Sequence, residues 1–533
     1  MTDNHLPPLI QALQNPKLFG HPAGHFRVIQ THISWVLLTG RFAYKIKKPL
    51  NLGFLDFSSL KKRLFYCQEE LRLNKRLSEK IYLDVIPISG SPEAPILNGK
   101  EPPIEYAVKM REFPQDAQLD RVLARGQLLA GHIDGLTTKL AQFHQRIPVA
   151  PMGSPFGSPN RIIQPIRENF QTIFKNITSR TERQDLSHLE HWIKKTHQLL
   201  RPLMKKRKKQ GFIRECHGDM HLGNMALLKN QVIIFDCLEF NENLRWIDVM
   251  SEIAFLTMDL EDRRQYFFAN KILNGYLEKT GDYEGTRILR YFQVYRALVR
   301  AKVSCIRLNQ EGITKKDQKL IREEIKTYLN LAKGYTHPKE KWLAITHGFS
   351  GSGKTTLTQF LLEKTGALRI RTDVERKRLK GLSPSARTRS PIGKNLYSSH
   401  VTRQVYLKMR GLAKMILGAG FPVIVDGTFL KKLQRKILQP IARDINIPFV
   451  ILNFKAPEST LRSRINRRKK KASDASEANL DVLKHQIFSQ EPLEKKEQFY
   501  TIDFDVGKEI KEEQKLKKLI RLIKKLKNKK TFC

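Results

Sequence analysis

A glycine-rich segment in the C-terminal half constrains the fold of this chain more than any other feature. It runs from Gly348 to Thr355, follows an apolar stretch at 343–347 and precedes an amphipathic stretch at 355–364. This pattern predicts a strand, a tight loop and a helix, so that backbone N–H groups and the helix N-terminus can surround phosphate oxygens. Further strand patterns, separated by helical stretches, predict a parallel α/β sheet around the loop. They lie at 367–371, 421–425 and 449–454.

The residues of this loop are those that nucleotide binding requires. We expect cofactor contacts from Gly348, Phe349, Ser350, Gly351, Ser352, Gly353, Lys354, Thr355 and Thr356. Lys354 is expected to reach the β and γ phosphates and to assist catalysis, and Thr355 to ligate magnesium. Asp426 ends a run of apolar residues, where it would position magnesium or its water. The expected cofactors are therefore ATP and Mg²⁺.

A second motif, at 217–224, points to phosphoryl transfer from a different direction. Transfer to a hydroxyl needs a carboxylate near the attacking oxygen, acids or amides that hold magnesium, and a lysine on the phosphates. Protein kinases place the catalytic aspartate five residues before a metal-binding asparagine, and Asp219 here precedes Asn224 by five. Asp236 ends the next apolar run, where a second magnesium ligand belongs. His217 and His221 are expected to shape the loop through hydrogen bonds rather than to bind metal.

With these residues, the region from about 20 to 330 resembles the aminoglycoside phosphotransferase and choline kinase branch of the protein-kinase-like fold. The resemblance implies that Asp219 orients or deprotonates the acceptor hydroxyl and that Asn224 and Asp236 hold magnesium. It also implies that Lys45 binds phosphate and that Glu70 is its ion-pair partner, with the adjacent Glu69 as the alternative. It assigns a buried, structural role to three later residues, Arg245, Asp248 and Glu252.

Two departures from the protein-kinase pattern bear on the substrate. No glycine-rich loop precedes Lys45. The segment that begins with the candidate magnesium ligand Asp236 is Asp236-Cys237-Leu238, where protein kinases have Asp-Phe-Gly. Regulation by a moving Asp-Phe-Gly segment is therefore not expected. Small hydroxylated molecules become better candidates for the acceptor than proteins.

Just after the second strand pattern of the C-terminal half, the segment 371–376 carries Asp373 and Arg376, and it resembles the Asp-x-x-Arg element of polynucleotide kinase and the gluconate kinase-like P-loop proteins. The resemblance implies that Asp373 activates the acceptor hydroxyl and that Arg376 contacts the acceptor. It also implies a lid with arginines that close over the transferred group, or alternatively a solvated basic helix; the candidates are Arg462, Arg464, Arg467 and Arg468. Through the segments 31–35, 44–49, 53–57 and 371–379 and the two motifs, nearly the full chain resembles bacterial two-domain proteins that join a phosphotransferase-like domain to a P-loop kinase of the gluconate or zeta-toxin-like group.

The expected fold is an α+β protein-kinase-like domain, with a small β lobe and a helical lobe, followed by an α/β P-loop domain with a parallel sheet. Strand patterns at 27–50 and 104–110 flank a helix at 60–77, and 119–208 is largely helical. The expected boundaries are 1–335, a linker at 336–341, the P-loop kinase domain at 342–507 and a basic amphipathic segment at 508–533. That last segment is expected to pack its apolar stripe on the domain, or alternatively to bind a membrane surface or nucleic acid.

The composition says more about the cellular compartment of the protein than about its binding partner. The 533 residues carry five scattered cysteines without metal-ligand spacing, no long apolar stretch and no recognisable signal segment, which favours a cytoplasmic protein without a membrane span. The formal net charge of +44 raises nucleic acid as a partner, but the excess is dispersed along the chain. A small or nucleotide-like acceptor is therefore favoured over nucleic acid. The sequence leaves the oligomeric state open.

Three hypotheses follow from these motifs. The first is an ATP-dependent kinase with two nucleotide-binding sites, both acting on small or nucleotide-like hydroxyl compounds. The second is a nucleic-acid 5'-hydroxyl kinase, which rests on Asp373, Arg376 and the positive charge. The third is a nucleotide-sensing regulator with little turnover. The sequence identifies neither acceptor.

Overall fold

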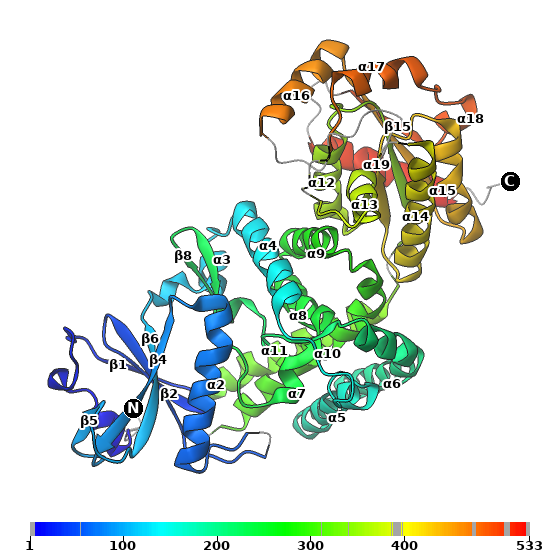
Figure 1. Cartoon of the computed structure of the whole chain (residues 1–533). Coiled ribbons are helices and arrows are strands. Elements are labelled where there is room, and N and C mark those ends of the chain that lie inside the picture. Colours follow the sequence, from blue (N-terminus) through cyan, green and yellow to red (C-terminus); the bar gives the residue numbers. More distant parts are fainter. Residues whose placement is uncertain are drawn as a thin grey trace. The chain divides into compact units, whose positions relative to one another are not determined.

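The computed structural model divides the chain into two compact units (Figure 1). It describes residues 6–528 except 54, 311, 339, 385, 387, 389–395, 397, 472–475 and 506–511. Unit 1 comprises 1–263 and 291–336, and unit 2 comprises 264–290 and 337–533. The expected domain boundaries are continuous, whereas residues 264–290 group with the C-terminal unit. Of the expected C-terminal segment, 508–511 and 529–533 lie outside the described residues.

Unit 1 begins with an antiparallel sheet. Among the described residues its strand order is β1-β2-β3-β6-β4-β5. The bounds are Arg27–Gln30, Ser34–Leu38 and Phe42–Lys47 for β1 to β3, and Tyr82–Gly90, Pro95–Leu97 and Glu105–Arg111 for β4 to β6. Helix α2 (Leu60–Ser78) packs on one face through Cys67 and Leu71. The short N-terminal helix α1 (Pro8–Ala12) brings Ile10 to a second core cluster with β2, β3 and β4. The expected strands and helix of this lobe are confirmed.

Two strands of the sheet, β4 and β5, are absent from the sequence-based expectation. For β4, the signal against a strand is Pro87, because proline has no backbone N–H and is unusual in a central strand. In the structure Pro87 stands opposite Tyr106 of β6, and its carbonyl accepts a hydrogen bond from the N–H of Asn98. The strand thus pairs on both sides although one residue contributes no donor.

The rest of unit 1 is mainly helical. It contains α3 (Leu119–Ala124), α4 (Ala130–Arg146), α5 (Pro159–Asn176), α6 (Arg180–Lys209), α7 (Glu242–Arg245), α8 (Val249–Asp262), the Tyr291–Leu308 part of α10 (Thr286–Leu308) and α11 (Lys315–Thr336). Two short pairs of strands interrupt the helices. β7 (Ile213–Glu215) pairs with β10 (Trp246–Asp248), and β8 (Met225–Leu228) pairs with β9 (Gln231–Ile234). The 217–224 motif lies between β7 and β8, and Asp236 follows β9.

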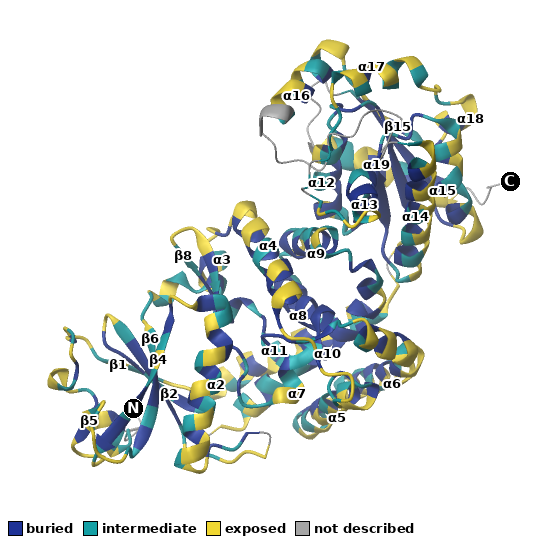
Figure 2. Cartoon of the chain, in the orientation of Figure 1, coloured by how far each residue is buried: buried dark blue, intermediate teal, exposed yellow. Residues whose placement is uncertain are grey.

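Unit 2 is built on a parallel sheet with the order β12-β13-β11-β14-β15 in the part of the chain that the structure describes. The strands are β11 (Leu343–His347), β12 (Leu368–Arg371), β13 (Val423–Asp426), β14 (Phe449–Lys455) and β15 (Thr501–Asp505). Every residue of β11 and β13 is buried, and Figure 2 shows this sheet as the dark core of the unit. The expected α/β fold with a parallel sheet is confirmed.

Helices accompany these strands. They are α9 (Tyr266–Thr280), the Thr286–Arg290 end of α10, α12 (Lys354–Thr365), α13 (Thr372–Arg378), α14 (Ser399–Gly418), α15 (Lys432–Asp444), α16 (Glu458–Lys471), α17 (Leu480–Ser489), α18 (Lys495–Gln498) and α19 (Glu512–Asn528). Helix α19 lies against β14 and β15. Its residues Leu519, Ile523 and Leu526 are buried, so the apolar stripe of this helix packs on the unit as expected.

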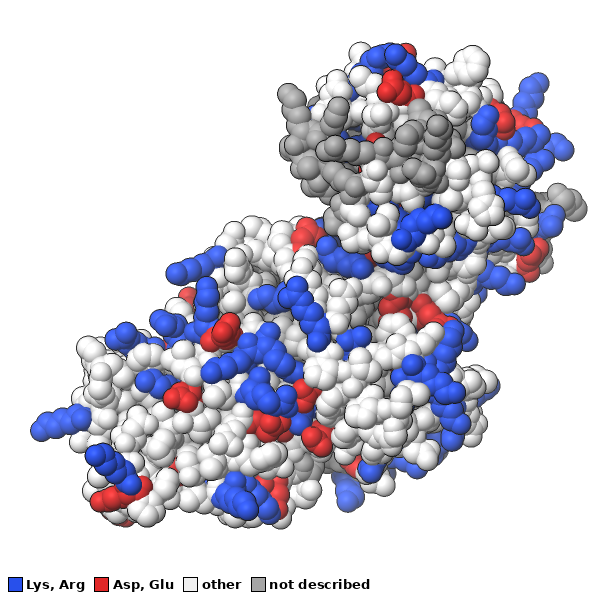
Figure 3. Space-filling view, viewed as in Figure 1, with Lys and Arg blue, Asp and Glu red and all other residues white. Residues whose placement is uncertain are grey.

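The surface reflects the composition. On the face drawn in Figure 3, Lys and Arg side chains are spread over both units and interspersed with Asp and Glu, rather than gathered in one stripe. Within the described ranges, no helix is both long enough and apolar enough to cross a membrane.

Candidate functional sites

The first site begins with a buried lysine in the antiparallel sheet. Lys45 on β3 forms ion pairs with Glu70 on α2 at 2.7 Å and with Asp236 at 2.6 Å. Glu70 is fully buried, whereas Glu69 pairs instead with Arg72 at 2.8 Å. The structure thus brings together three residues that the sequence singled out. It selects Glu70 over Glu69 as the partner of Lys45.

A second lysine, which belongs to no motif, completes this cluster. Lys47 is fully buried and pairs with Glu70 at 2.7 Å and with Glu239. Burial raises the pKa of Glu239 more than Lys47 lowers it, because the nearby Glu70 adds repulsion. Two lysines and three carboxylates therefore form one continuous polar cluster between β3, α2 and the segment after β9. The only sequence signal was the period-two spacing of the lysines, which places them on the same face of β3.

Asp236 sits in a backbone conformation that few residues other than glycine adopt. Its φ is 61°, and its N–H donates to the hydroxyl of Tyr82 at 3.1 Å. A positive φ at a non-glycine residue stores strain and is typical of functional positions. In this conformation the carboxylate of Asp236 contacts the ammonium group of Lys45.

The 217–224 motif forms a rigid loop around the candidate base. Asn224 donates from Nδ2 to Asp219 Oδ2 at 2.9 Å, and His221 Nε2 lies 3.4 Å from the same oxygen. Burial by itself would raise the pKa of Asp219, but the charges of His221 and Arg300 outweigh it and hold this pKa below its usual range. His217 is fully buried against the carbonyl oxygen of Phe235 at 2.9 Å, and burial lowers its pKa. The Nδ1 atom of His217 accepts a hydrogen bond from the N–H of Asp219 at 3.3 Å, so both histidines contact the loop itself.

Two helices hold this loop from behind. Glu252 on α8 accepts a hydrogen bond from the N–H of Gly218 at 2.8 Å, and its other oxygen lies 2.7 Å from His144 Nε2. Arg296 on α10 donates to the carbonyl of Gly218 at 3.0 Å. Position 218 requires glycine, because the φ of Gly218 is 90° and a Cβ there would lie 2.9 Å from the carbonyl oxygen of Leu244. These helices therefore fix the position from which Asp219 acts.

The cluster around Glu252 also has the composition of a metal site. Ligand atoms of His144, Cys216 and Glu252 lie within 4.8 Å of one another. Burial raises the pKa of the Cys216 thiol well above its usual value, which disfavours the thiolate that metal binding requires. Both oxygens of Glu252 are already bonded to His144 and the loop. The cluster is accounted for by support of the loop.

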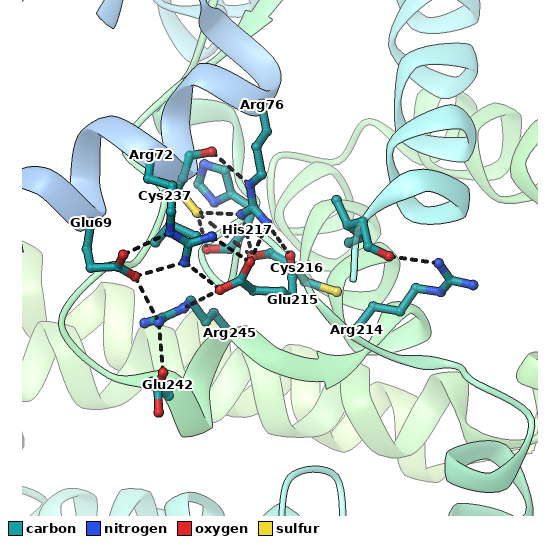
Figure 4. A network of polar contacts seen from close by, with 12 residues as sticks. Glu69, Arg72, Arg76, Arg214, Glu215, Cys216, His217, Cys237, Glu242 and Arg245 are labelled. Carbon is teal, nitrogen blue, oxygen red and sulfur yellow. Dashed lines mark hydrogen bonds and ion pairs between the residues drawn. The ribbon is translucent and has the colours of Figure 1, made fainter. Parts of the chain in front are cut away.

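A network of arginines around Glu215 connects α2 to β7, the strand that precedes the 217–224 loop (Figure 4). The Glu215 carboxylate forms ion pairs with Arg72 at 2.7 Å, Arg76 at 3.1 Å and Arg245 at 3.3 Å. Arg245 also reaches Glu69 at 3.3 Å, which explains the place of Glu69 in the structure. Behind this network, Asp248 pairs with the fully buried Arg207 at 2.7 Å. The residues expected to give buried support, Arg245, Asp248 and Glu252, are all buried.

The second site is the glycine loop of unit 2. The φ of Gly348 is 139°, and a Cβ there would lie 2.6 Å from the carbonyl oxygen of Phe454. Side chains therefore cannot fill this bend, and the backbone stays open to an anion. Lys354 is buried at the start of α12 and donates to the carbonyls of Gly348 at 2.9 Å and Phe349 at 2.6 Å. Its ammonium group thus lies inside the loop.

The two candidate metal ligands of the second site, Thr355 on α12 and Asp426 at the end of β13, are in contact. Thr355 Oγ1 donates to Asp426 Oδ2 at 2.9 Å, although the two residues are 71 positions apart. A hydroxyl and a carboxylate at this spacing are the oxygen ligands that magnesium prefers. The glycine bend, Lys354 and this oxygen pair together fit a magnesium-bound nucleotide.

The loop opens into a cavity of about 640 Å³. Asp373 and Arg376 on α13 line it, and Arg376 donates to the carbonyl of Leu396 at 2.9 Å. The lid candidates Arg464, Arg467 and Arg468 also line it, whereas Arg462 pairs with Glu458 on α16. The loop residues on the wall of this cavity are Ser350, Gly351, Gly353, Lys354, Thr355 and Thr356. Phe349 packs beside the loop in an apolar cluster, and Ser352 is buried.

One comparison with known proteins bears directly on this second site. Residues 343–493 match the family model described as an AAA domain. The match contains the glycine loop, Asp373, Asp426 and α16. The resemblance of the C-terminal region to P-loop proteins is therefore confirmed.

Several known proteins are similar to this chain over a large part of their own length. Uncharacterized proteins of Mycobacterium tuberculosis and Mycobacterium bovis are each 29% identical over 449 residues, which cover 84% of this chain and 87% of theirs. The chain is also similar to a choline/ethanolamine kinase family protein from Mesorhizobium loti, with 10% identity over 61% of this chain and 98% of that one, at a TM-score of 0.36. A gluconokinase from Sinorhizobium meliloti is 18% identical over 36% of this chain and 98% of its own, at a TM-score of 0.26.

Proposed function

We propose that this protein is an ATP-dependent phosphotransferase with two nucleotide-binding sites, one in each unit. The observation that carries the proposal is the convergence of motif residues that lie far apart in the sequence. Lys45 meets Asp236 at 2.6 Å across 191 positions in unit 1, and Thr355 meets Asp426 at 2.9 Å across 71 positions in unit 2. A lysine or loop for phosphates beside oxygen ligands for magnesium is the arrangement that phosphoryl transfer requires.

In the first site, Lys45 binds phosphate oxygens of ATP, and Glu70 holds its ammonium group in place at 2.7 Å. Asn224 and Asp236 hold magnesium, which neutralises charge on the phosphates. Asp219 accepts the proton of the acceptor hydroxyl or orients that hydroxyl. Its low pKa supports the second role more than the first, because a weak base removes a proton poorly before the transfer begins.

In the second site, the backbone of residues 348–353 and the ammonium of Lys354 bind the phosphates of ATP. Thr355 and Asp426 hold magnesium, as their 2.9 Å contact suggests. Asp373 lies on the wall of the same cavity and serves as base for the acceptor hydroxyl. Arg376 contacts the acceptor, and an arginine of α16 stabilises the charge of the transferred group.

A second candidate function, a nucleic-acid 5'-hydroxyl kinase, is favoured by one observation. The cavity of unit 2 carries Arg376, Arg464, Arg467 and Arg468 on its wall, more cationic groups than acidic ones. Such a wall suits an acceptor that carries phosphate of its own. This candidate and a nucleotide-like small acceptor share the same chemistry, so the transfer assay must contain both.

The test is a transfer screen with γ-labelled ATP over pooled metabolites and 5'-hydroxyl oligonucleotides. The full chain is compared with Asp219→Asn, Lys354→Ala and Asp373→Asn. Lys364→Ala is the matched control, because Lys364 lies on the same helix as Lys354 but is exposed. A product lost only in Asp219→Asn assigns its reaction to unit 1, and a product lost in both other active-site variants assigns it to unit 2. ATP binding without any labelled product would refute the transferase and favour a nucleotide-sensing regulator.

A further inference from the structure

Helix α9 covers the exposed edge of the parallel sheet in unit 2. Strand β12 stands at the end of the strand order, and an edge strand presents backbone groups without strand partners. Asn274 on α9 serves both kinds of group: its Nδ2 donates to the carbonyl of Ala367 at 3.0 Å, and its Oδ1 accepts from the N–H of Arg369 at 2.8 Å. Asn270 donates to the carbonyl of Glu363 at 3.0 Å. The segment 264–290 therefore belongs to the fold of unit 2, although it lies more than 50 residues before the glycine loop in the sequence.

The same helix brings a carboxylate to the candidate nucleotide site. Glu278 on α9 pairs with Arg371 at 3.0 Å and with Arg369 at 3.3 Å. Burial disfavours the ionised carboxyl, but Arg371 and Arg369 outweigh burial and lower the pKa of Glu278. Glu278 is therefore a carboxylate at neutral pH.

Arg371 lies between this carboxylate and the candidate magnesium ligand. It ends β12 and lines the cavity, with Nη1 at 3.0 Å from Glu278 and Nε at 3.8 Å from Asp426 Oδ2. Only 11% of its side chain is exposed, so water screens these charges weakly. The guanidinium is thus held in full contact with Glu278 and at the outer limit of ion pairing with Asp426.

We propose that Glu278 is a positioning residue of the second site, which holds Arg371 away from Asp426 and so leaves this carboxylate available to magnesium. The inference rests on the proposed nucleotide site of unit 2 and adds to it a residue that no motif contains. If Glu278 loses its charge, Arg371 can close the 3.8 Å gap and pair with Asp426. A guanidinium and a magnesium ion would then compete for one carboxylate.

The experiment measures the magnesium dependence of ATP binding by isothermal titration calorimetry. It uses the full chain with Asp236→Asn, which removes a candidate metal carboxylate of the first site. In this background, Glu278→Gln is expected to raise the Mg²⁺ concentration for half-maximal ATP binding about tenfold, the equivalent of one strong charge contact. Adding Arg371→Gln to Glu278→Gln is expected to restore the original requirement to within about twofold, because the competing cation is gone.

The control is Glu284→Gln, since Glu284 lies in the same segment but pairs with Arg287 at 3.7 Å. It should leave the magnesium requirement unchanged. A general loss of stability in Glu278→Gln would persist after Arg371→Gln, so reversal by the second substitution separates positioning from folding.

Two results overturn the inference alone: an unchanged magnesium requirement in Glu278→Gln, or a raised one that Arg371→Gln fails to reverse. A different result overturns the proposed second site and the inference together. In that result, the Asp236→Asn chain shows no magnesium-dependent binding of ATP, or shows binding that Lys354→Ala does not abolish.

Discussion

Replacing Lys47 with methionine tests the buried polar cluster of unit 1. Methionine keeps most of the aliphatic length of the lysine but removes the ammonium group, which lies 4.8 Å from the ring centroid of Phe57. Lys47 is fully buried and is the closest cation to Glu239, whose side chain is only 3% exposed. The variant therefore leaves a buried carboxylate without its ion-pair partner.

The size of the effect follows from this geometry. Removing one partner of a buried ion pair costs about 3–5 kcal/mol of unfolding free energy, because the remaining charge stays out of water. Glu70 loses one of its two lysines but keeps Lys45 at 2.7 Å, so most of the cost falls on Glu239. We expect the free energy of unfolding to fall by about 3–5 kcal/mol at pH 8.

The penalty should shrink as the pH falls. Burial already raises the pKa of Glu239 in the wild type, and loss of Lys47 raises it further. A folded-state pKa above the unfolded value of about 4.3 means that the folded variant binds a proton that the unfolded chain does not. Lower pH therefore stabilises the variant relative to the wild type. The penalty is therefore expected to be largest at pH 8 and to fall as the pH approaches the folded pKa.

Urea unfolding followed by tryptophan fluorescence measures this penalty. Three of the four tryptophans, Trp35, Trp192 and Trp246, lie in unit 1, so the signal reports mainly on that unit. Lys48→Met is the matched control, because Lys48 is the next residue and only partly buried. It should cost less than about 1 kcal/mol. A Lys47→Met penalty that equals the control, or one that is independent of pH, would refute the reasoning.

Three further predictions concern the two sites. Gly348→Ala would place a Cβ 2.6 Å from the Phe454 carbonyl oxygen, so calorimetry should show ATP affinity of the second site falling at least about tenfold; unchanged affinity contradicts the open-bend account. Glu252→Ala removes the acceptor of the Gly218 N–H, and steady-state kinetics should show kcat of the first site falling about 10- to 100-fold, with KM for ATP within about threefold. Because the pKa of Asp219 is lowered, this carboxylate stays ionised as the pH falls, so the rate of first-site transfer should stay flat down to about pH 5; a loss of transfer with a midpoint well above pH 5 would contradict this.

Much of the architecture follows from local patterns in the sequence. A glycine bend between a strand and a helix, and an aspartate five residues before an asparagine, are properties of short contiguous segments. They can be recognised from their own residues, and the φ of 139° at Gly348 agrees with the expected glycine bend. The fold class, the glycine loop and the 217–224 loop could therefore be predicted from the sequence. The roles assigned to their residues stay predictions.

The choice between Glu69 and Glu70 as the partner of Lys45 could not be predicted from such local patterns. Both residues lie on α2, and consecutive residues on a helix point about 100° apart, so only one can face the sheet. The helical period shows that one face is buried but not which neighbour each position meets. Packing decided that Glu70 faces Lys45 and that Glu69 faces Arg72 and Arg245.

The sequence by itself determined two phosphate-handling motifs, the helices and strands that carry them, and their order along the chain. Tertiary structure alone decided that Lys47 and Glu239 share a buried cluster and that α9 joins unit 2, where Glu278 meets Arg371. The physical reason is the range of the interactions. Loop and helix signals act over a few residues, whereas ion pairs across 93 or 192 positions form only when packing brings distant segments together.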